Sequence, residues 1–204
     1  MATILLITSS PRGADSISSK VAKAVVETLQ EKNPGSSVVT RDLAAKPLPY
    51  LDAAFLGAVY TPEESRTAEQ KAYSDLGFEI INEVLTANYI VIASALINFS
   101  VPATLRSWVD YLVRNGVTFK YGENGPVGVI DGSAKQVIFV EARGGVYAGE
   151  AAAYLHSTDS YLKGVLGWLG LTKTQSINIE GLAYGPEASE KAIAAALEQA
   201  KLVE

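Results

Sequence analysis

The chain has 204 residues, of which 48% are hydrophobic and 19% charged, and its formal net charge is −5. This balance is typical of a globular protein, and the length suits one domain, 1–204, with a core of its own. The negative charge disfavours nucleic acid and anionic membrane surfaces as partners, the lack of cysteine excludes disulfides and thiolate sites, and a single histidine excludes a histidine-rich metal centre.

The start of the chain predicts a cytoplasmic protein. Residues 1–7 carry no basic side chain ahead of their apolar run, and this run is shorter than the hydrophobic region of a secretory signal peptide. No apolar stretch elsewhere in the sequence reaches the roughly 20 residues that a membrane-spanning helix needs. We therefore expect neither secretion nor membrane insertion.

Short runs rich in β-branched residues alternate with longer helical patterns along the chain. The short runs predict strands at 3–8, 37–41, 89–94, 136–141 and 174–179. The helical patterns predict helices at 18–32, 68–86, 102–114, 151–169 and 186–202. Residues 42–66 contain three prolines and no clear period, so we expect a long connection there, whereas glycine and aromatic residues at 116–132 indicate an excursion with a hairpin.

Strands that alternate with helices require a parallel sheet whose two faces are covered by helices. Five strands and five helices predict a three-layer, doubly wound α/β fold of the flavodoxin-like type, with strand order 2-1-3-4-5. In this order the chain changes direction between strands 1 and 3. Ligands of such folds bind in the crevice beyond the carboxyl ends of the strands at this point, so the fold predicts where the site lies.

The loop after the first strand, 9–19, is rich in serine and leads into the first helix. Serine hydroxyls and the free N–H groups of a helix N-terminus together favour a phosphate group. The patterns G-x-x-x-x-G-K-[ST] and G-x-G-x-x-G are both absent, which favours a terminal phosphate, such as that of FMN, over a nucleoside triphosphate or a dinucleotide. The alternative is an ordinary turn with a serine N-cap, which needs only one serine.

Two further loops end at the same edge of the predicted sheet. After the third strand, Asn98 offers donors and an acceptor and Phe99 an aromatic face, which suit a flat heterocycle, although the apolar residues here could instead belong to the core. After the fourth strand, Gly144 and Gly145 allow the backbone to approach a ligand closely, or they form a flexible turn. Together the three loops predict one site for a heterocycle that carries a phosphate.

Five segments of the sequence together resemble the pattern of a known protein family. They are LLITSSPRGADSISS at 5–19, RDLAAKPLPYLD at 41–52, NFSVPATLRSWVDYLVRNGVTFKYGENGPVG at 98–128, ARGG at 142–145 and EGLAYGPE at 180–187. This set resembles the family of FMN-dependent NADH-azoreductases and quinone reductases, over essentially the whole chain. The chain has ALINF at 95–99 where that family often has P-M-Y-N-F, and ARGG where it often has S-R-G-G, so we expect flavin binding to persist without the tyrosine beside the ring.

The resemblance implies a homodimer with active sites at the subunit interface, tightly bound FMN, and NADH or NADPH as electron donor. The implied contacts with the phosphate and ribityl chain of FMN come from Ser10, Ser16, Ile17 and Ser18. Those with the ring come from Leu96, Ile97, Asn98 and Phe99, with Ala142, Arg143, Gly144 and Gly145 closing the far edge.

The implied reaction is hydride transfer from NAD(P)H to quinones and reductive cleavage of aromatic azo compounds, by a ping-pong mechanism. FMN carries this chemistry, so no side chain is assigned a certain catalytic role and no metal is expected. Phe119, Tyr121 and Trp168 are candidates for a hydrophobic wall around the acceptor, reaching from the partner subunit, or for ordinary packing in a hairpin and a helix. Arg143 either stabilises anionic reduced flavin or forms a surface ion pair, and His156 has no paired acid for proton transfer.

Two other functions fit the same fold. One is a quinone reductase whose azo activity is incidental. The other is an electron carrier of the flavodoxin type, or a flavin-binding regulator, without turnover of its own. Carriers of this fold are usually strongly acidic and shield the flavin between aromatic residues, whereas here the net charge is −5 and the loop after the third strand has lost an aromatic residue. An enzyme is therefore the preferred interpretation.

Overall fold

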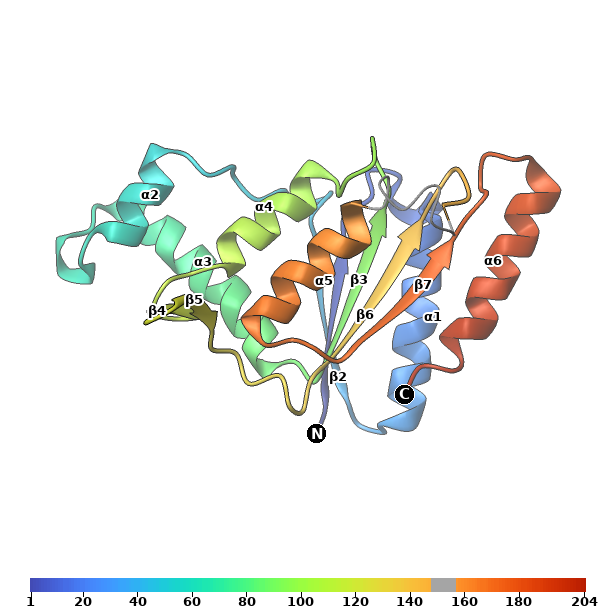
Figure 1. Cartoon of the computed structure of the whole chain (residues 1–204), viewed down its shortest axis with the longest axis horizontal. Coiled ribbons are helices and arrows are strands. Elements are labelled where there is room, and N and C mark those ends of the chain that lie inside the picture. Colours follow the sequence, from blue (N-terminus) through green and yellow to red (C-terminus); the bar gives the residue numbers. More distant parts are fainter. Residues whose placement is uncertain (148–156) are drawn as a thin grey trace.

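A central sheet of five parallel strands organises the structure, a computed structural model that describes residues 1–147 and 157–204 (Figure 1). Its spatial order is β2-β1-β3-β6-β7. The strands are β1 (Thr3–Thr8), β2 (Ser37–Asp42), β3 (Tyr89–Ala95), β6 (Gln136–Ala142) and β7 (Thr174–Ile179). The remaining strands, β4 (Phe119–Gly122) and β5 (Gly125–Gly128), pair with each other as a separate antiparallel hairpin. The prediction of a five-stranded parallel sheet with a hairpin excursion is confirmed.

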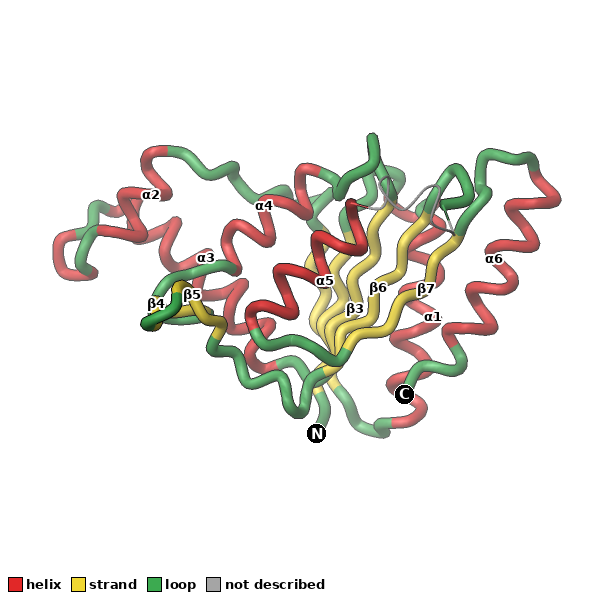
Figure 2. Tube along the Cα trace, viewed as in Figure 1, coloured by secondary structure: helices red, strands yellow, loops and turns green. Residues whose placement is uncertain are grey.

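Helices cover both faces of the sheet, so the fold has three layers. The helices are α1 (Ile17–Lys32), α2 (Ala53–Tyr60), α3 (Ala68–Thr86), α4 (Ala103–Leu112), α5 (Ser157–Leu169) and α6 (Pro186–Ala200). Helices α1 and α6 lie on one face, and α3, α4 and α5 lie on the other (Figure 1). The loops that follow β1, β3, β6 and β7 gather along the upper edge of the sheet in Figure 2, where the carboxyl ends of these strands lie.

Side chains of alternate strand residues pack into two separate hydrophobic cores, one on each face of the sheet. On β1, the side chains of Ile4 and Leu6 pack with α1 and α6, whereas those of Leu5 and Ile7 pack with α3, α4 and α5. This follows from the strand period of two residues, which points successive side chains to opposite faces. All four side chains are buried, as expected for a strand covered on both sides.

The sequence predicts a long connection without regular structure over 42–66. This prediction is wrong, because the segment contains α2. The Asp52 carboxylate caps this helix, with Oδ1 accepting a hydrogen bond from the Phe55 N–H at 2.8 Å. The buried Phe55 ring packs edge-on against Tyr111 of α4, with ring centroids 4.7 Å apart. The helix has only eight residues between prolines, so its sequence is too short to show a helical period, and tertiary contacts hold it in place.

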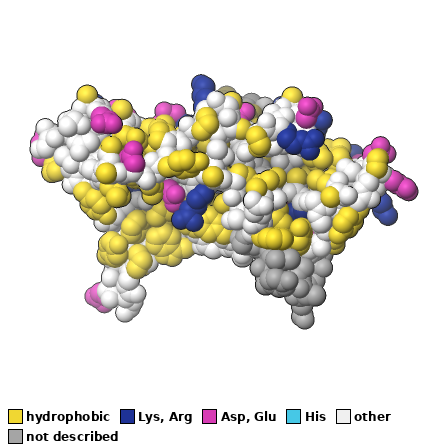
Figure 3. Space-filling model, turned by 90° about the horizontal axis from the view of Figure 1, so that it is seen from above, with side chains coloured by type: hydrophobic (Ala, Val, Ile, Leu, Met, Phe, Trp, Pro, Cys, Tyr) yellow, Lys and Arg dark blue, Asp and Glu magenta, His cyan; other side chains and the backbone are white. Residues whose placement is uncertain are grey.

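The β4–β5 hairpin docks onto the end of α5 through close backbone contacts. A Cβ atom added to Gly128 would lie 2.1 Å from the carbonyl oxygen of Trp168, so any larger residue here would force the two backbones apart. The indole N–H of Trp168 donates to the Pro126 carbonyl at 3.1 Å. Viewed from above, hydrophobic side chains gather in the left half of the molecule (Figure 3), which in Figure 1 holds α2, α3, α4 and the hairpin.

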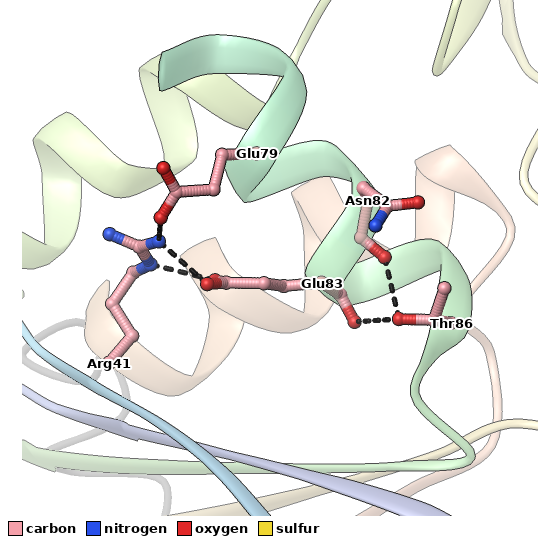
Figure 4. Close-up of polar contacts among 5 residues, drawn as sticks. All are labelled: Arg41, Glu79, Asn82, Glu83 and Thr86. Atoms are coloured by element: carbon pink, nitrogen blue, oxygen red, sulfur yellow. Dashed lines mark hydrogen bonds and ion pairs between the residues drawn. The ribbon is translucent and has the colours of Figure 1, made fainter. Parts of the chain in front are cut away.

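An ion-pair cluster ties the edge strand β2 to α3. The guanidinium of Arg41 donates from Nε and from an Nη atom to the two carboxylate oxygens of Glu83, at 2.7 and 2.6 Å, and also contacts Glu79 (Figure 4). Hydrogen bonding to Glu83, above all, raises the pKa of Arg41. In the last turn of the same helix, the Thr86 hydroxyl donates to the Asn82 carbonyl at 2.8 Å. This cluster therefore fixes the carboxyl end of the edge strand to the helix that packs beside it.

Candidate functional site

The N-terminus of α1 presents hydrogen-bond donors beside the carboxyl end of β1. Ser16 is the N-cap: its Oγ accepts a hydrogen bond from the Ser19 N–H at 3.2 Å and lies 3.2 Å from the Ser18 Oγ. Both Ser16 and Ser18 are buried. The N–H groups of Ile17 and Ser18 belong to the first turn, and neither has a hydrogen-bond partner among the described residues. These donors and the positive end of the helix dipole suit an anionic group.

The residues between β1 and α1 form a compact turn that brings Ser10 next to this helix end. The Ser10 Oγ accepts a hydrogen bond from the Arg12 N–H at 3.3 Å, and the Ser10 side chain is buried. Ser9 donates from Oγ to the Ala93 carbonyl at 3.0 Å, which joins the ends of β1 and β3. Gly13 has a φ of 53°, a left-handed conformation that suits glycine and lets the chain turn toward Ser16.

The loop after β3 is a tight turn with two residues of left-handed backbone at its tip. Ile97 and Ser100 exchange backbone hydrogen bonds of 3.0 and 2.9 Å, while Asn98 and Phe99 between them have φ values of 48° and 63°. Asparagine tolerates the left-handed region, but phenylalanine there costs about 1–2 kcal/mol. The exposed Phe99 ring packs edge-on against Tyr147, with centroids 6.2 Å apart. Strain retained at an exposed tip is typical of a ligand-contacting loop.

The loop after β6 is anchored by a buried ion-pair cluster. The Arg143 guanidinium donates to Glu141 Oε2 at 2.5 and 2.7 Å and to Glu180 Oε1 at 3.0 Å, and the Arg143 side chain is 2% exposed. Burial lowers the pKa of Arg143, but the two carboxylates outweigh this effect, so the net shift is upward. Of the two roles that the sequence left open for Arg143, the surface ion pair is wrong, because the guanidinium and Glu141 are buried and Glu180 is only 17% exposed. The cation holds the loop in place.

A cleft of about 280 Å³ lies between these loops. It is lined by Ser10, Arg12, Ser16, Ile17, Ser18, Ala95, Leu96, Ile97, Ala142, Arg143, Gly144, Leu182 and Ala183. The structure therefore brings together most of the residues predicted to contact the cofactor. Within the described part of the chain, the exceptions are Asn98, Phe99 and Gly145, which lie within two residues of Ile97 or Gly144 in the sequence. Leu182 and Ala183 were not predicted, although they follow the strand next to β6 and so reach the same edge of the sheet.

A second, more apolar chamber of about 400 Å³ adjoins the cleft and shares Ser10, Arg12, Ala95 and Ile97 with it. Its other walls are Ser9, Pro11, Ala44, Pro102, Ala103 and Thr104. The two hollows together therefore combine a polar end at the N-terminus of α1 with an apolar end beside α4. A ligand with a flat apolar ring system and a polar tail would match these two ends.

Phe119, Tyr121 and Trp168 form a cluster at the hairpin. The Phe119 ring lies 5.7 Å from that of Tyr121 and 5.3 Å from that of Trp168, measured between centroids. None of the three lines the cleft or the adjoining chamber in the described part of this chain, because the hairpin lies away from the carboxyl edge of the sheet (Figure 1). A contribution to the site of a partner subunit stays a prediction.

The residues of the cleft fit FMN. Buried serine hydroxyls and the free N–H groups of Ile17 and Ser18 provide the donor set that a phosphate monoester needs. The N–H groups of Gly144 and Gly145 have no partner among the described residues, so they can donate to acceptor atoms at a ring edge. Apolar atoms of Leu96 and Ile97 complete the wall between these two ends.

Two features are absent from the described ranges, and one candidate residue lies outside them. In residues 1–147 and 157–204, no group of three or more His, Asp or Glu side chains could hold a metal ion. None of the helices described combines the length and apolar character needed to cross a bilayer. His156 and the beginning of the predicted helix 151–169 lie outside the described residues, so the structure gives no account of them.

Comparison with known proteins gives consistent findings. A family model described as a flavodoxin-like fold matches residues 2–203. The chain is 52% identical, over 96% of its length and 95% of the relative's, to an FMN-dependent NADH:quinone oxidoreductase from Rhizobium johnstonii.

Solved structures agree with this result. The crystal structure of an azoreductase from Bacillus anthracis superposes with a TM-score of 0.88 at 31% identity, covering 99% of this chain and 98% of the other. An FMN-dependent NADH-azoreductase from the same species, solved in complex with FMN, has a TM-score of 0.87 at 26% identity and covers 99% of both chains.

Proposed function

The chain belongs to the flavodoxin-like family of FMN-dependent NADH:quinone oxidoreductases, and from this membership we propose that its cleft binds FMN and that it passes hydride from NADH to quinones. The observation that carries the proposal is the convergence of three loops on one cleft, with a phosphate-binding helix end and a glycine loop at its two ends. The names of the relatives, which describe enzymes, favour turnover over the role of an electron carrier or regulator.

The chain's own residues supply binding and orientation. The Ser16 and Ser18 hydroxyls and the first-turn N–H groups of α1 fix the phosphate end. The N–H groups of Gly144 and Gly145 hold the acceptor atoms at the far edge of the ring system. FMN, when bound, supplies the hydride-transfer chemistry.

NADH and the acceptor use the same opening in turn under this proposal, which predicts ping-pong kinetics. The azoreductase structures among the relatives support aromatic azo compounds as further substrates. A quinone needs one two-electron delivery and full azo cleavage needs two, so one site can serve both. Initial rates measured with a benzoquinone and with a simple azo dye, each at several NADH concentrations, should give parallel double-reciprocal lines. Intersecting lines would show a ternary complex and contradict the kinetic scheme.

A homodimer is the assembly that the surface supports. Large hydrophobic side chains are exposed on α2, α3 and the hairpin, on the half of the molecule where Figure 3 shows hydrophobic atoms gathered: Leu56, Tyr60, Phe78, Tyr121 and Val127. Exposed apolar area of this kind marks protein contacts. In a dimer, the cluster of Phe119, Tyr121 and Trp168 would be available to wall the acceptor site of the partner subunit. Sedimentation equilibrium should give twice the monomer mass of 21.6 kDa.

A direct test uses the purified protein. We expect a yellow preparation with flavin absorption bands, bleached by NADH under anaerobic conditions and re-oxidised by a benzoquinone. A colourless preparation that neither binds added FMN nor oxidises NADH in the presence of quinone would overturn the proposal.

A further inference from the structure

Glu180 connects Arg143 and Tyr147, which flank the glycine pair that follows β6. Its Oε1 atom accepts a hydrogen bond from the Arg143 guanidinium at 3.0 Å and another from the Tyr147 backbone N–H at 3.0 Å. Gly144 and Gly145 lie between these two residues. A single carboxylate oxygen therefore closes the segment 143–147 around the glycine pair. Glu180 itself follows β7, so this contact joins loops that are far apart in sequence.

The same loop is fixed along its backbone by the residues that follow Glu180. The carbonyl groups of Arg143, Gly144 and Gly145 accept hydrogen bonds of 3.2, 2.9 and 2.9 Å from the N–H groups of 182, 183 and 181. The acceptors of the loop are thus occupied by the segment 181–183. Its glycine N–H donors have no partner among the described residues, and Gly144 lines the cleft.

The negative charge of Glu180 helps to compensate the buried positive charge of Arg143. Arg143 is buried and also bound by Glu141, which is 4% exposed, so the cation sits between two carboxylates. Removing one partner of a buried ion pair leaves the other poorly compensated, and the local structure rearranges to restore its contacts. The Glu141–Arg143–Glu180 cluster also has a net charge of −1 beside the cleft, if both acids are ionised.

We propose that Glu180 is a positioning residue for the ring end of the cleft. Its carboxylate fixes Arg143 and Tyr147, so the N–H groups of Gly144 and Gly145 stay aligned for the acceptor atoms at the edge of a bound heterocycle. It also contributes negative charge near that edge. This inference rests on the proposed function, because it assumes that the heterocycle is FMN.

Two substitutions test the proposal. Glu180→Gln keeps an oxygen that can accept from the Tyr147 N–H but removes the charge, and Glu180→Ala removes both. Glu187→Gln is the matched control, since Glu187 is an exposed acid at the start of α6. Val84→Ala, on the buried face of α3, controls for a general loss of stability. The flavin-free forms are titrated with FMN by fluorescence, and hydrogen exchange is followed at the amides of 143–147.

The expected results differ between variants. Glu180→Ala raises the Kd of FMN about tenfold or more and accelerates exchange at 143–147. Glu180→Gln raises the Kd less, but shifts the midpoint potential of bound flavin to less negative values because a negative charge is lost. The Glu187 and Val84 variants leave the Kd, the potential and this exchange unchanged.

The proposal fails if Glu180→Gln and Glu180→Ala bind FMN within twofold of the wild-type protein, with unchanged potential and exchange. It also fails if Val84→Ala reproduces their effects, since Glu180 would then act only through stability. If the wild-type protein itself does not bind FMN, the proposed function is overturned, and the exchange data alone still decide whether Glu180 fixes the loop.

Discussion

Ser16 has two roles that one pair of substitutions can separate. Its hydroxyl caps α1 and also lines the cleft where the phosphate of FMN is expected. Aspartate is as good an N-cap as serine, so Ser16→Asp should leave the flavin-free protein as stable as the wild type. The new carboxylate would face the phosphate. At about 4 Å and an effective dielectric constant of about 20, two unit charges repel by roughly 4 kcal/mol, which weakens FMN binding about a thousandfold.

Ser16→Ala should behave differently. It removes the cap, which costs about 1 kcal/mol of stability, and one hydrogen bond to a charged group, worth about 1.5–3 kcal/mol, so FMN binds roughly ten- to a hundredfold more weakly. Urea unfolding of the flavin-free protein gives the first quantity and fluorescence titration with FMN the second, with Ser65→Asp, at an exposed serine, as the control for added charge. If Ser16→Asp bound FMN within tenfold of the wild type, the phosphate would not lie at this helix end.

Three further predictions concern the core, the hairpin and the glycine loop. Burial raises the pKa of Tyr111 to about 12 from 10.0, so its share of the stability is fully present below pH 10 and is lost as the pH rises through 12, with roughly 2 kcal/mol gone by pH 11.5. Urea unfolding at pH 9 and 11.5 should show this fall, and Tyr111→Phe should make the fall smaller by about this amount. Gly128→Ala should cost about 1–3 kcal/mol in urea unfolding because its Cβ meets backbone, whereas Gly164→Ala, with open space at its Cβ, should not destabilise the protein. Gly145→Ala would place a Cβ 3.1 Å from the Tyr147 ring and should raise the Kd of FMN about fivefold, for roughly 1 kcal/mol of ring displacement, with little change in unfolding.

The sheet could be predicted because its signals are local. The apolar run at 3–8 reads as a strand buried on both faces, and the structure has β1 over the same residues. By contrast, α2 could not be predicted, because its eight residues depend on a cap from Asp52 and on the packing of Phe55 against Tyr111. Those contacts join segments that a local pattern cannot connect.

The candidate site also combines residues that local sequence signals predict with contacts that they do not. Serines at the start of a helix and paired glycines after a strand are local signals, and the structure brings Ser16, Ser18 and Gly144 to one cleft. The ion pair between Arg143 and Glu180 spans 37 residues, so the sequence alone did not reveal it. The left-handed backbone of Phe99 was equally hidden, because an aromatic residue is not a usual signal for that conformation.

A crystal structure of the protein grown with excess FMN tests the central claim most directly. The claim predicts density for the phosphate against the N–H groups of Ile17 and Ser18, and for the ring between Leu96–Phe99 and the Gly144–Gly145 pair. Density for FMN elsewhere on the molecule, or a cleft closed by its own side chains while the protein is saturated with FMN, would contradict it.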